Sequence, residues 1–192
     1  MRQFTLYGSL IATFALMAGC REAGHQPAAA DLAVAPAEAI AARGGNAPAA
    51  KNFVSPMDPG QEVREVVSNA RGNAVYKLSR DGSTLHYRVI VAGAEDLLQG
   101  HIHVGPRGSN GPVVAFLFNF TAAPVTKNGV IAEGTITAAD VIARPAIGFD
   151  GSFESLLREM RRGNTYTNVH TVEFPAGEVR GQIRAVGPPH RH

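Results

Sequence analysis

The chain has 192 residues, with 18 Lys and Arg, 16 Asp and Glu, one Cys and no Trp. This length allows one ordinary domain with appendages. The net charge of +2 is too small to suggest a nucleic-acid-binding protein, which would have a strongly basic face. A single Cys excludes an intramolecular disulfide and a zinc site built from several thiolates. The position of that residue, Cys20, therefore needs another explanation.

Residues 1–19 are typical of a secretory signal peptide. Arg2 is the only charged residue before Cys20, and residues 4–19 form an uncharged, largely apolar run. The alternative is an uncleaved membrane anchor, because about 20 apolar residues are enough to span a bilayer. The signal interpretation is preferred, since the only Cys of the chain stands directly after this run.

The segment LMAGC at residues 16–20 resembles the lipobox of bacterial lipoproteins. The resemblance implies cleavage before Cys20, acylation of Cys20 and attachment of the mature chain to membrane lipid. It also implies an extracytoplasmic location in a bacterial cell envelope. Arg21 is not the Asp with which enterobacterial lipoproteins are retained in the inner membrane, so the outer membrane is favoured where one exists.

Residues 20–52 are predicted to be a flexible tether. Between residues 21 and 50 there are 13 Ala, 3 Pro and no aromatic residue, so little apolar surface is available to offset the entropy of ordering. An Ala-rich helix within residues 28–43 is the alternative, although the prolines limit its length. The tail at residues 187–192 is predicted to be disordered, which leaves residues 53–186 as the folded domain.

Most of the domain has the pattern of strands. Residues 74–80 and 85–91 alternate apolar and polar side chains around the turn dipeptide Asp81-Gly82, which predicts a hairpin. Further strands are predicted over residues 100–104, 113–118, 129–134, 165–172 and 178–185. Short strands at these intervals predict an all-β, antiparallel sandwich or barrel of the immunoglobulin-like or Greek-key kind.

Two segments depart from the strand pattern. Thr137 and Asp140 have the spacing of a capping box, which predicts a short helix there. Residues 152–162 place Phe153, Leu156, Leu157 and Met160 on one helical face, which predicts a second helix. Both helices are expected to be insertions between strands rather than a layer of their own.

Histidines provide the candidate site. In a strand, His101 and His103 point to the same side, as do Tyr166, Asn168 and His170 in a later predicted strand. If the two strands pair, three imidazoles converge, which is enough for a copper or zinc site supported by Tyr166 or Asn168. The alternatives are a buried polar network without an ion, or unpaired surface histidines.

Two neighbouring segments supply further candidates. Glu178 and Arg180 share a predicted strand face, which indicates a structural ion pair or a contact with the loop after His103. That loop is too short for a collagen helix and lacks the Gly-Lys-Ser/Thr of a phosphate loop. It is predicted to be a binding loop formed by Gly105, Arg107, Gly108, Asn110 and Gly111. No catalytic residue is assigned.

Three motifs in order resemble the CHRD domain, which was first described in chordin. They are HIHVGPRGSNGPV at residues 101–113, YTNVHT at 166–171 and PAGEVRGQ at 175–182, after similar opening strands at 74–78 and 85–89. Ala176 stands where the family usually has Gly. The resemblance covers about residues 60–185 and implies an immunoglobulin-like or Greek-key fold and no established reaction. The growth factors that chordin binds are not expected as partners of this chain, because the cysteine-rich repeats of chordin have no counterpart here.

Three functions are compatible with these features. The preferred one is a lipid-anchored, non-catalytic binding or structural module that contacts an envelope protein, a polymer or a matrix component. The second is a copper- or zinc-binding protein that uses His101, His103 and His170. The third is an enzyme resembling Cu/Zn superoxide dismutase, which also has a His-x-His strand, but only His25 and His86 lie outside this trio and the tail.

Overall fold

The computed structural model describes residues 49–187. The predicted signal peptide, Cys20, most of the predicted tether and residues 188–192 lie outside this range. Within the described range, no helix combines the length and apolar character needed to cross a membrane.

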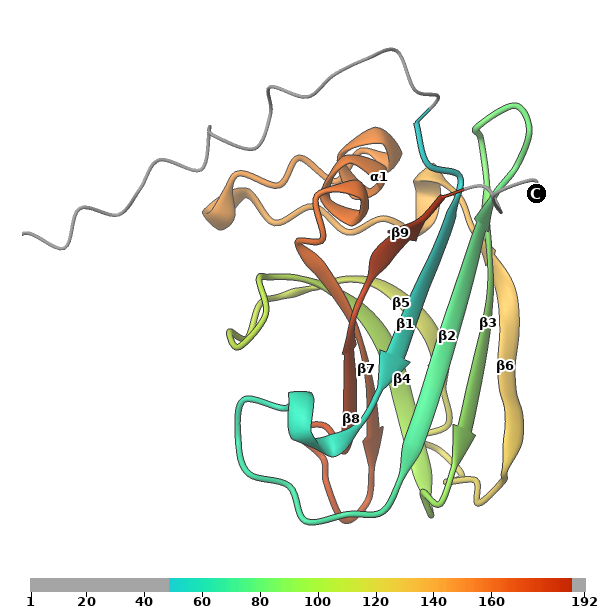
Figure 1. Cartoon of the computed structure of the whole chain (residues 1–192), viewed down its shortest axis with the longest axis vertical. Coiled ribbons are helices and arrows are strands. Elements are labelled where there is room, and N and C mark those ends of the chain that lie inside the picture. The colour runs from blue at the N-terminus through green and yellow to red at the C-terminus, as the bar shows by residue number, and fades with distance from the viewer. Residues whose placement is uncertain (1–48, 188–192) are drawn as a thin grey trace, which may run out of the picture. The chain divides into compact units, whose positions relative to one another are not determined.

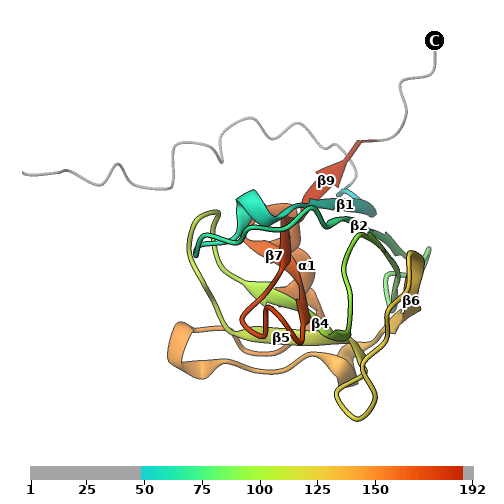
Figure 2. The same cartoon turned by 90° about the horizontal axis from the view of Figure 1, so that it is seen from below.

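Two antiparallel sheets pack face to face (Figure 1). The five-stranded sheet has the order β6 (Gly129–Ile136), β3 (Leu85–Ala92), β2 (Arg71–Leu78), β1 (Asn52–Met57) and β9 (Arg184–Val186). The four-stranded sheet has the order β5 (Val113–Asn119), β4 (Leu97–Val104), β7 (Thr165–Thr171) and β8 (Val179–Gln182). Figure 2 shows that β1, β2 and β6 lie in one layer and that β4 and β5 lie in the other. The described strands therefore form a sandwich and not a closed barrel, which confirms the predicted all-β class.

The predicted hairpin is formed by β2 and β3. Their pairing runs without a break from Arg71 opposite Ala92 to Leu78 opposite Leu85. Gly82 adopts a φ of +79° in the connecting turn, a conformation that is unstrained only for glycine. Every second residue of β2 from Ala74 onward is buried, as the alternation predicts.

The core lies between the two sheets. Aliphatic side chains from both inner faces fill it, including Leu85 and Val89 from one sheet and Ile102 and Val169 from the other. Tyr76 and Thr167 join the sheets through a hydrogen bond of 2.7 Å between their hydroxyls. Because Ile102 faces this core, the neighbouring residues of β4 point to the opposite, outer face of the four-stranded sheet.

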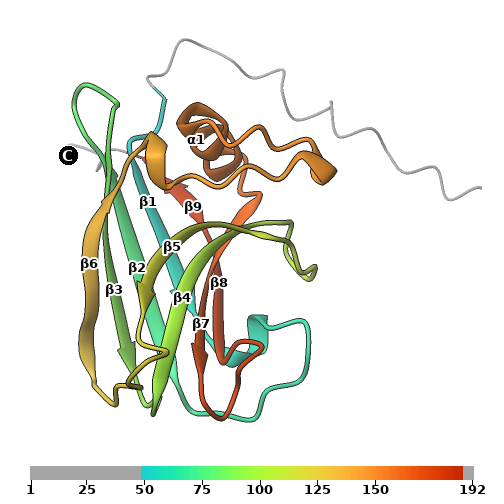
Figure 3. The ribbon, with the colours of Figure 1, turned by 180° about the vertical axis from the view of Figure 1, so that it is seen from behind.

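The helical insertions lie at one end of the sandwich (Figure 3). Helix α1 (Phe153–Arg161) begins where the Ser152 hydroxyl accepts a hydrogen bond from the Ser155 amide, and it buries the predicted apolar residues Leu156, Leu157 and Met160. The capping box at Thr137 is present but begins only a 3-10 turn, Ala138–Asp140. Of the other 3-10 turns, Pro145–Ile147 lies at the same end, whereas Pro59–Gln61 follows β1 toward the opposite end (Figure 3).

The two ends of the domain differ from the sequence prediction. Strand β1 is absent from the predicted strands, because Ser55 and Pro56 obscure its alternation. The predicted strand at 178–185 is divided at Ile183, so β8 and β9 belong to different sheets. The Ser55 hydroxyl donates to the Gly181 carbonyl at 2.7 Å, which joins β1 to β8 across the edge of the sandwich.

Candidate metal centre

Strand pairing places the site on the outer face of the four-stranded sheet. Strand β7 pairs with β4 so that Asn168 lies opposite His101 and Tyr166 lies opposite His103. Directly opposite residues share a face, and a residue two positions further along lies diagonally beside them. His170 is that diagonal neighbour of His101, so the three histidines predicted to converge stand on one patch of sheet.

Loops cover this outer face. All seven residues of β7 are buried, although only its inner face contacts the other sheet. Residues 105–112, 58–70 and 172–178 supply the cover, because each of these segments forms a hydrogen bond with a polar side chain of this face. The segments 105–112 and 58–70 both extend beyond β8, at different heights (Figures 1 and 3). The outer face therefore has the burial of a core while it contains polar side chains, and these side chains need hydrogen-bond partners or a ligand.

The three imidazoles meet as the sequence predicts. One nitrogen from each of His101, His103 and His170 lies within 4.8 Å of the other two. The closest approach is 3.2 Å, between Nδ1 of His101 and Nε2 of His170. The exposed fractions are only 4 %, 9 % and 7 %, respectively. The distance between the two strands' histidines is thus short enough for a shared ligand.

Hydrogen bonds fix which nitrogens carry lone pairs. Nδ1 of His103 donates to the Gly111 carbonyl at 2.8 Å, and Nδ1 of His170 donates to the Pro175 carbonyl at 3.1 Å. Their Nε2 atoms are therefore unprotonated in the neutral rings. His101 donates from Nδ1 to His170, which leaves its own Nε2 unprotonated. Among the described atoms, the buried Nε2 atoms of His101 and His103 have no hydrogen-bond partner.

The surroundings keep the three rings neutral. Burial lowers the pKa of His101 to about 3, and the neighbouring His170 and His103 act in the same direction. Burial also lowers the pKa of His103 to about 4 against the opposing hydrogen bond to Gly111. The pKa of His170 is lowered by burial, in spite of its bond to Pro175. At neutral pH the cluster therefore offers uncharged imidazoles, the form that binds metal ions.

Tyr166 and Arg180 support His103 from behind. The Tyr166 ring stacks on the His103 ring with centroids 4.7 Å apart and planes 9° from parallel. The Arg180 guanidinium lies over the other side of Tyr166, 3.5 Å from its centroid. The Gly111 amide donates to the Tyr166 hydroxyl at 3.0 Å, so the same glycine holds both rings of the stack. The orientation of His103 thus depends on a layered support.

Arg180 also fixes the predicted binding loop. Its guanidinium donates to the carbonyls of Pro106 at 3.0 Å and Ser109 at 2.8 Å, and to Oδ1 of Asn110 at 3.2 Å. Of the two predicted roles of Arg180, the structure shows the loop contact. Glu178 forms no ion pair with it and instead accepts a hydrogen bond from the Ser68 hydroxyl at 2.6 Å.

The members of the predicted loop differ in position. Gly111 directly contacts the site, Asn110 binds Arg180, and Gly105 is buried beneath the loop. Arg107 and Gly108 are exposed at its tip. Only the base of the loop is therefore part of the histidine cluster.

Two residues of the site have no signal in the sequence. Glu62 accepts a hydrogen bond from Nδ2 of Asn168 at 3.1 Å, and burial raises its pKa to about 7 although Arg180 and Asn168 lower it. Phe116 packs edge-on against His101 with centroids 4.6 Å apart and is 49 % exposed. The contact between loop 58–70 and β7 joins residues more than a hundred positions apart in the sequence, so no local pattern predicts it.

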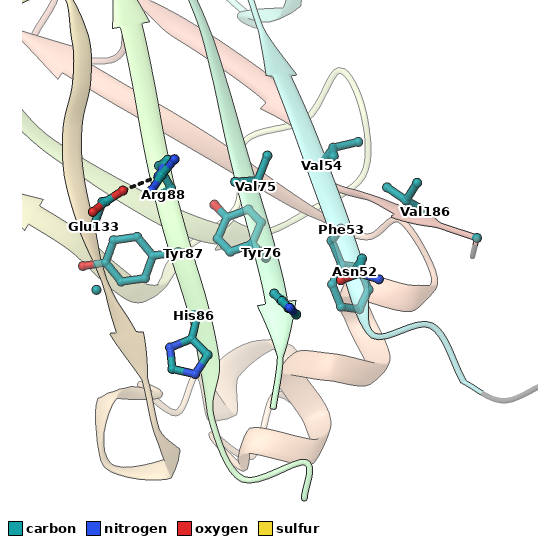
Figure 4. A pocket seen from close by; sticks show the side chains of 13 residues that line it. Asn52, Phe53, Val54, Val75, Tyr76, His86, Tyr87, Arg88, Glu133 and Val186 are labelled. Atoms are coloured by element: carbon teal, nitrogen blue, oxygen red, sulfur yellow. Dashed lines mark ion pairs between the residues drawn. The ribbon is translucent and has the colours of Figure 1, made fainter. Parts of the chain in front are cut away.

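A separate groove lies on the outer face of the five-stranded sheet (Figure 4). Its volume is about 690 Å³, with Val54, Val75 and Val186 on one side and His86 with the exposed Arg88–Glu133 ion pair on the other. His86 binds the Thr135 hydroxyl at 3.0 Å. In this groove His86, Arg88 and Glu133 already have partners and do not converge on one point, so the histidine cluster is the candidate site.

Comparison with known proteins agrees with this architecture. The family model of the CHRD domain matches residues 53–183, which is more than half of the chain and includes every residue of the cluster. No match was found among curated proteins or among solved structures. The chain therefore belongs to the CHRD domain family.

Proposed function

We propose that this protein is a membrane-attached, extracytoplasmic binding module whose ligand is a copper or zinc ion held by His101, His103 and His170. One observation carries the proposal: three buried, neutral imidazoles converge, and two of their lone pairs have no partner among the described atoms. A buried polar atom without a partner is costly, and a metal ion would satisfy these nitrogens together.

The spacing of the nitrogens supports a metal ion as the ligand. Two imidazole nitrogens bound tetrahedrally to one zinc ion, with bonds of 2.0–2.1 Å, lie about 3.3 Å apart. One nitrogen of each histidine lies within 4.8 Å of the other two, so small rotations of the rings would bring three nitrogens to this separation. Nδ1 of His101 and Nε2 of His170 are already 3.2 Å apart, and His101 would bind an ion through Nδ1 only after the proton of that hydrogen bond had moved to Nε2. The carbonyls of Gly111 and Pro175 orient two of the rings in the way that supporting groups orient metal-bound histidines.

The attachment to a membrane is proposed from the sequence. The LMAGC segment ending at Cys20 and the Ala- and Pro-rich stretch after it support a lipid anchor and a spacer. We place the domain outside the cytoplasm, in an outer membrane where one exists. Labelling of cells with a radioactive fatty acid tests this: the wild-type chain is expected to incorporate the label and Cys20→Ala is expected to lose it.

Elemental analysis tests the metal proposal. The full chain is purified in detergent. The substitutions His25→Asn, His190→Asn and His192→Asn remove the histidines that lie outside the described domain. After exposure to copper or zinc and gel filtration, we expect about one ion per chain. His103→Ala is expected to lose the ion while retaining the β-sheet circular dichroism spectrum.

His86→Asn is the matched control, because His86 is an exposed histidine on the other sheet, and this substitution is expected to leave metal loading unchanged. Failure of the starting chain to retain an ion would refute the site. Equal loss of the ion in the His86→Asn and His103→Ala variants would also refute it. Superoxide turnover by the copper-loaded chain would replace the binding module with the enzyme interpretation.

A further inference from the structure

We propose that the histidine cluster selects copper in its monovalent state, Cu(I), over Cu(II) and Zn(II). This inference rests on the proposed metal site and concerns which ion that site accepts. Four features of the described residues support it, namely the charge of the ligands, the burial of the cluster, the positive charge near His103 and the number of ligands.

The ligand set carries no charge. Within the described residues, no Cys, Asp or Glu joins the three histidines in a metal-ligating group. Thiolates and thioethers are the usual ligands that select Cu(I), so the preference here has to come from another source. Since neutral imidazoles cancel none of the ion's charge, a divalent ion would keep two full units of positive charge in the site and Cu(I) would keep one.

Burial penalises the divalent ions more. The free Nε2 atoms of His101 and His103 are inaccessible to water, and all three rings are at least nine-tenths buried. The Born cost of moving an ion out of water increases with the square of its charge, so it is about four times greater for a divalent than for a monovalent ion of similar size. A buried site without anionic ligands therefore favours the lower charge.

Arginines add to this preference. The charges of Arg180 and Arg144 both act on His103. Arg180 is 1 % exposed and reaches the site through the Tyr166 stack, and Arg144 is held nearby by its Nε bond of 2.6 Å to the Val113 carbonyl. Each arginine repels a divalent ion twice as strongly as a monovalent one.

Two carboxylates oppose the arginines. Glu62 binds Asn168, the residue opposite His101, and burial raises its pKa to about 7. Glu178 is buried on the same face of the sheet as Arg180 and accepts a hydrogen bond from the Ser68 hydroxyl. Among the described residues, neither carboxylate forms a hydrogen bond or an ion pair with a histidine, whereas the charges of both arginines act on His103. The repulsion at His103 is therefore offset only in part, which favours the ion of lower charge.

The number of ligands points the same way. Protein zinc sites are almost always four-coordinate, and Cu(II) prefers tetragonal sites. Three nitrogens on one face of a sheet suit a closed-shell monovalent ion that needs no further ligand. Phe116 packs edge-on against His101 and offers an apolar neighbour instead of a fourth ligand.

Competition titrations test the selection. The detergent-purified full chain with the three outlying histidines replaced is titrated anaerobically with Cu(I) against bicinchoninate, and separately with Cu(II) and Zn(II) against nitrilotriacetate. We expect the Kd for Cu(I) to be at least about a hundredfold below those of the divalent ions. Equal or tighter binding of Cu(II) or Zn(II) would overturn the inference and leave the proposed metal site intact, whereas no binding of any ion would overturn both.

Arg144→Gln distinguishes the charge effect from a structural one. Loss of this charge is expected to strengthen Cu(II) binding roughly tenfold and Cu(I) binding roughly threefold, because the divalent ion feels twice the repulsion. A merely structural change would weaken both. Arg88→Gln, on the outer face of the other sheet, is the matched control and is expected to change neither. Equal effects of Arg144→Gln on both ions would contradict the inference.

Discussion

Replacement of Arg180 by Met is expected to lower the free energy of unfolding by about 2–4 kcal/mol. Met fills a similar volume but cannot donate to the carbonyls of Pro106 and Ser109 or to Asn110. The loop would lose these three bonds to β8 and keep the one from Gln182 to the Gly105 carbonyl, and the Tyr166 ring would lose the cation above it. Urea unfolding followed by fluorescence or circular dichroism measures the change.

The same substitution is expected to weaken metal binding by about 10- to 100-fold, because the loss of support for His103 outweighs the relief of repulsion between the Arg180 charge and the ion. Arg180→Lys retains the charge without the forked geometry and should recover only a small part of the loss. Arg88→Met removes an exposed ion pair and should cost about 0.5 kcal/mol or less. If Arg180→Met proves no more damaging than Arg88→Met, Arg180 does not support the loop.

Gly111→Ala is expected to cost about 2–3 kcal/mol or more, because a Cβ atom at this position would lie 1.6 Å from the Val104 carbonyl oxygen. The obstructing atom belongs to the backbone of a paired strand and has no room to move aside. The loop would have to shift and would withdraw the Gly111 carbonyl from His103. Thermal unfolding gives the stability, and the nitrogen NMR shifts of the His103 ring report the lost hydrogen bond.

Gly108→Ala provides a control in the same loop. A Cβ atom there meets nothing within 4 Å, so its cost is limited to the positive φ of +77°, about 1–2 kcal/mol. The His103 ring signals should not change in this variant. Equal losses in the two variants, or unchanged ring signals in Gly111→Ala, would show that close packing of Gly111 does not position His103.

The sequence was most informative where function follows from strand geometry. The His-x-His spacing sets His101 and His103 on one side of a strand, and the later alternation does the same for Tyr166 and His170. The fold class and the main helix followed from equally local patterns. Only the register of β7 on β4 was needed to bring the histidines together, and a single offset would have placed them on different parts of the sheet.

Long-range contacts account for what the sequence does not reveal. Glu62 reaches Asn168 from a loop that precedes most of the sheet, and its loop has no periodic pattern. Phe116 meets His101 because β4 has irregular pairing with β5 at this point, where His101 lies opposite Phe116. Such bulges and loop contacts depend on packing across the whole domain, so local residue spacing predicts neither.

The short pairing of β9 with β1 has a consequence for the connectivity of the domain. Asn52 and Val186 are direct partners in this pairing, so the chain enters and leaves the sandwich at adjacent points about 5 Å apart. A short linker between these points would make the domain continuous there, and new ends could be opened in the exposed loop at residues 121–124. The domain is thus suited to circular permutation and to insertion within a surface loop of another protein.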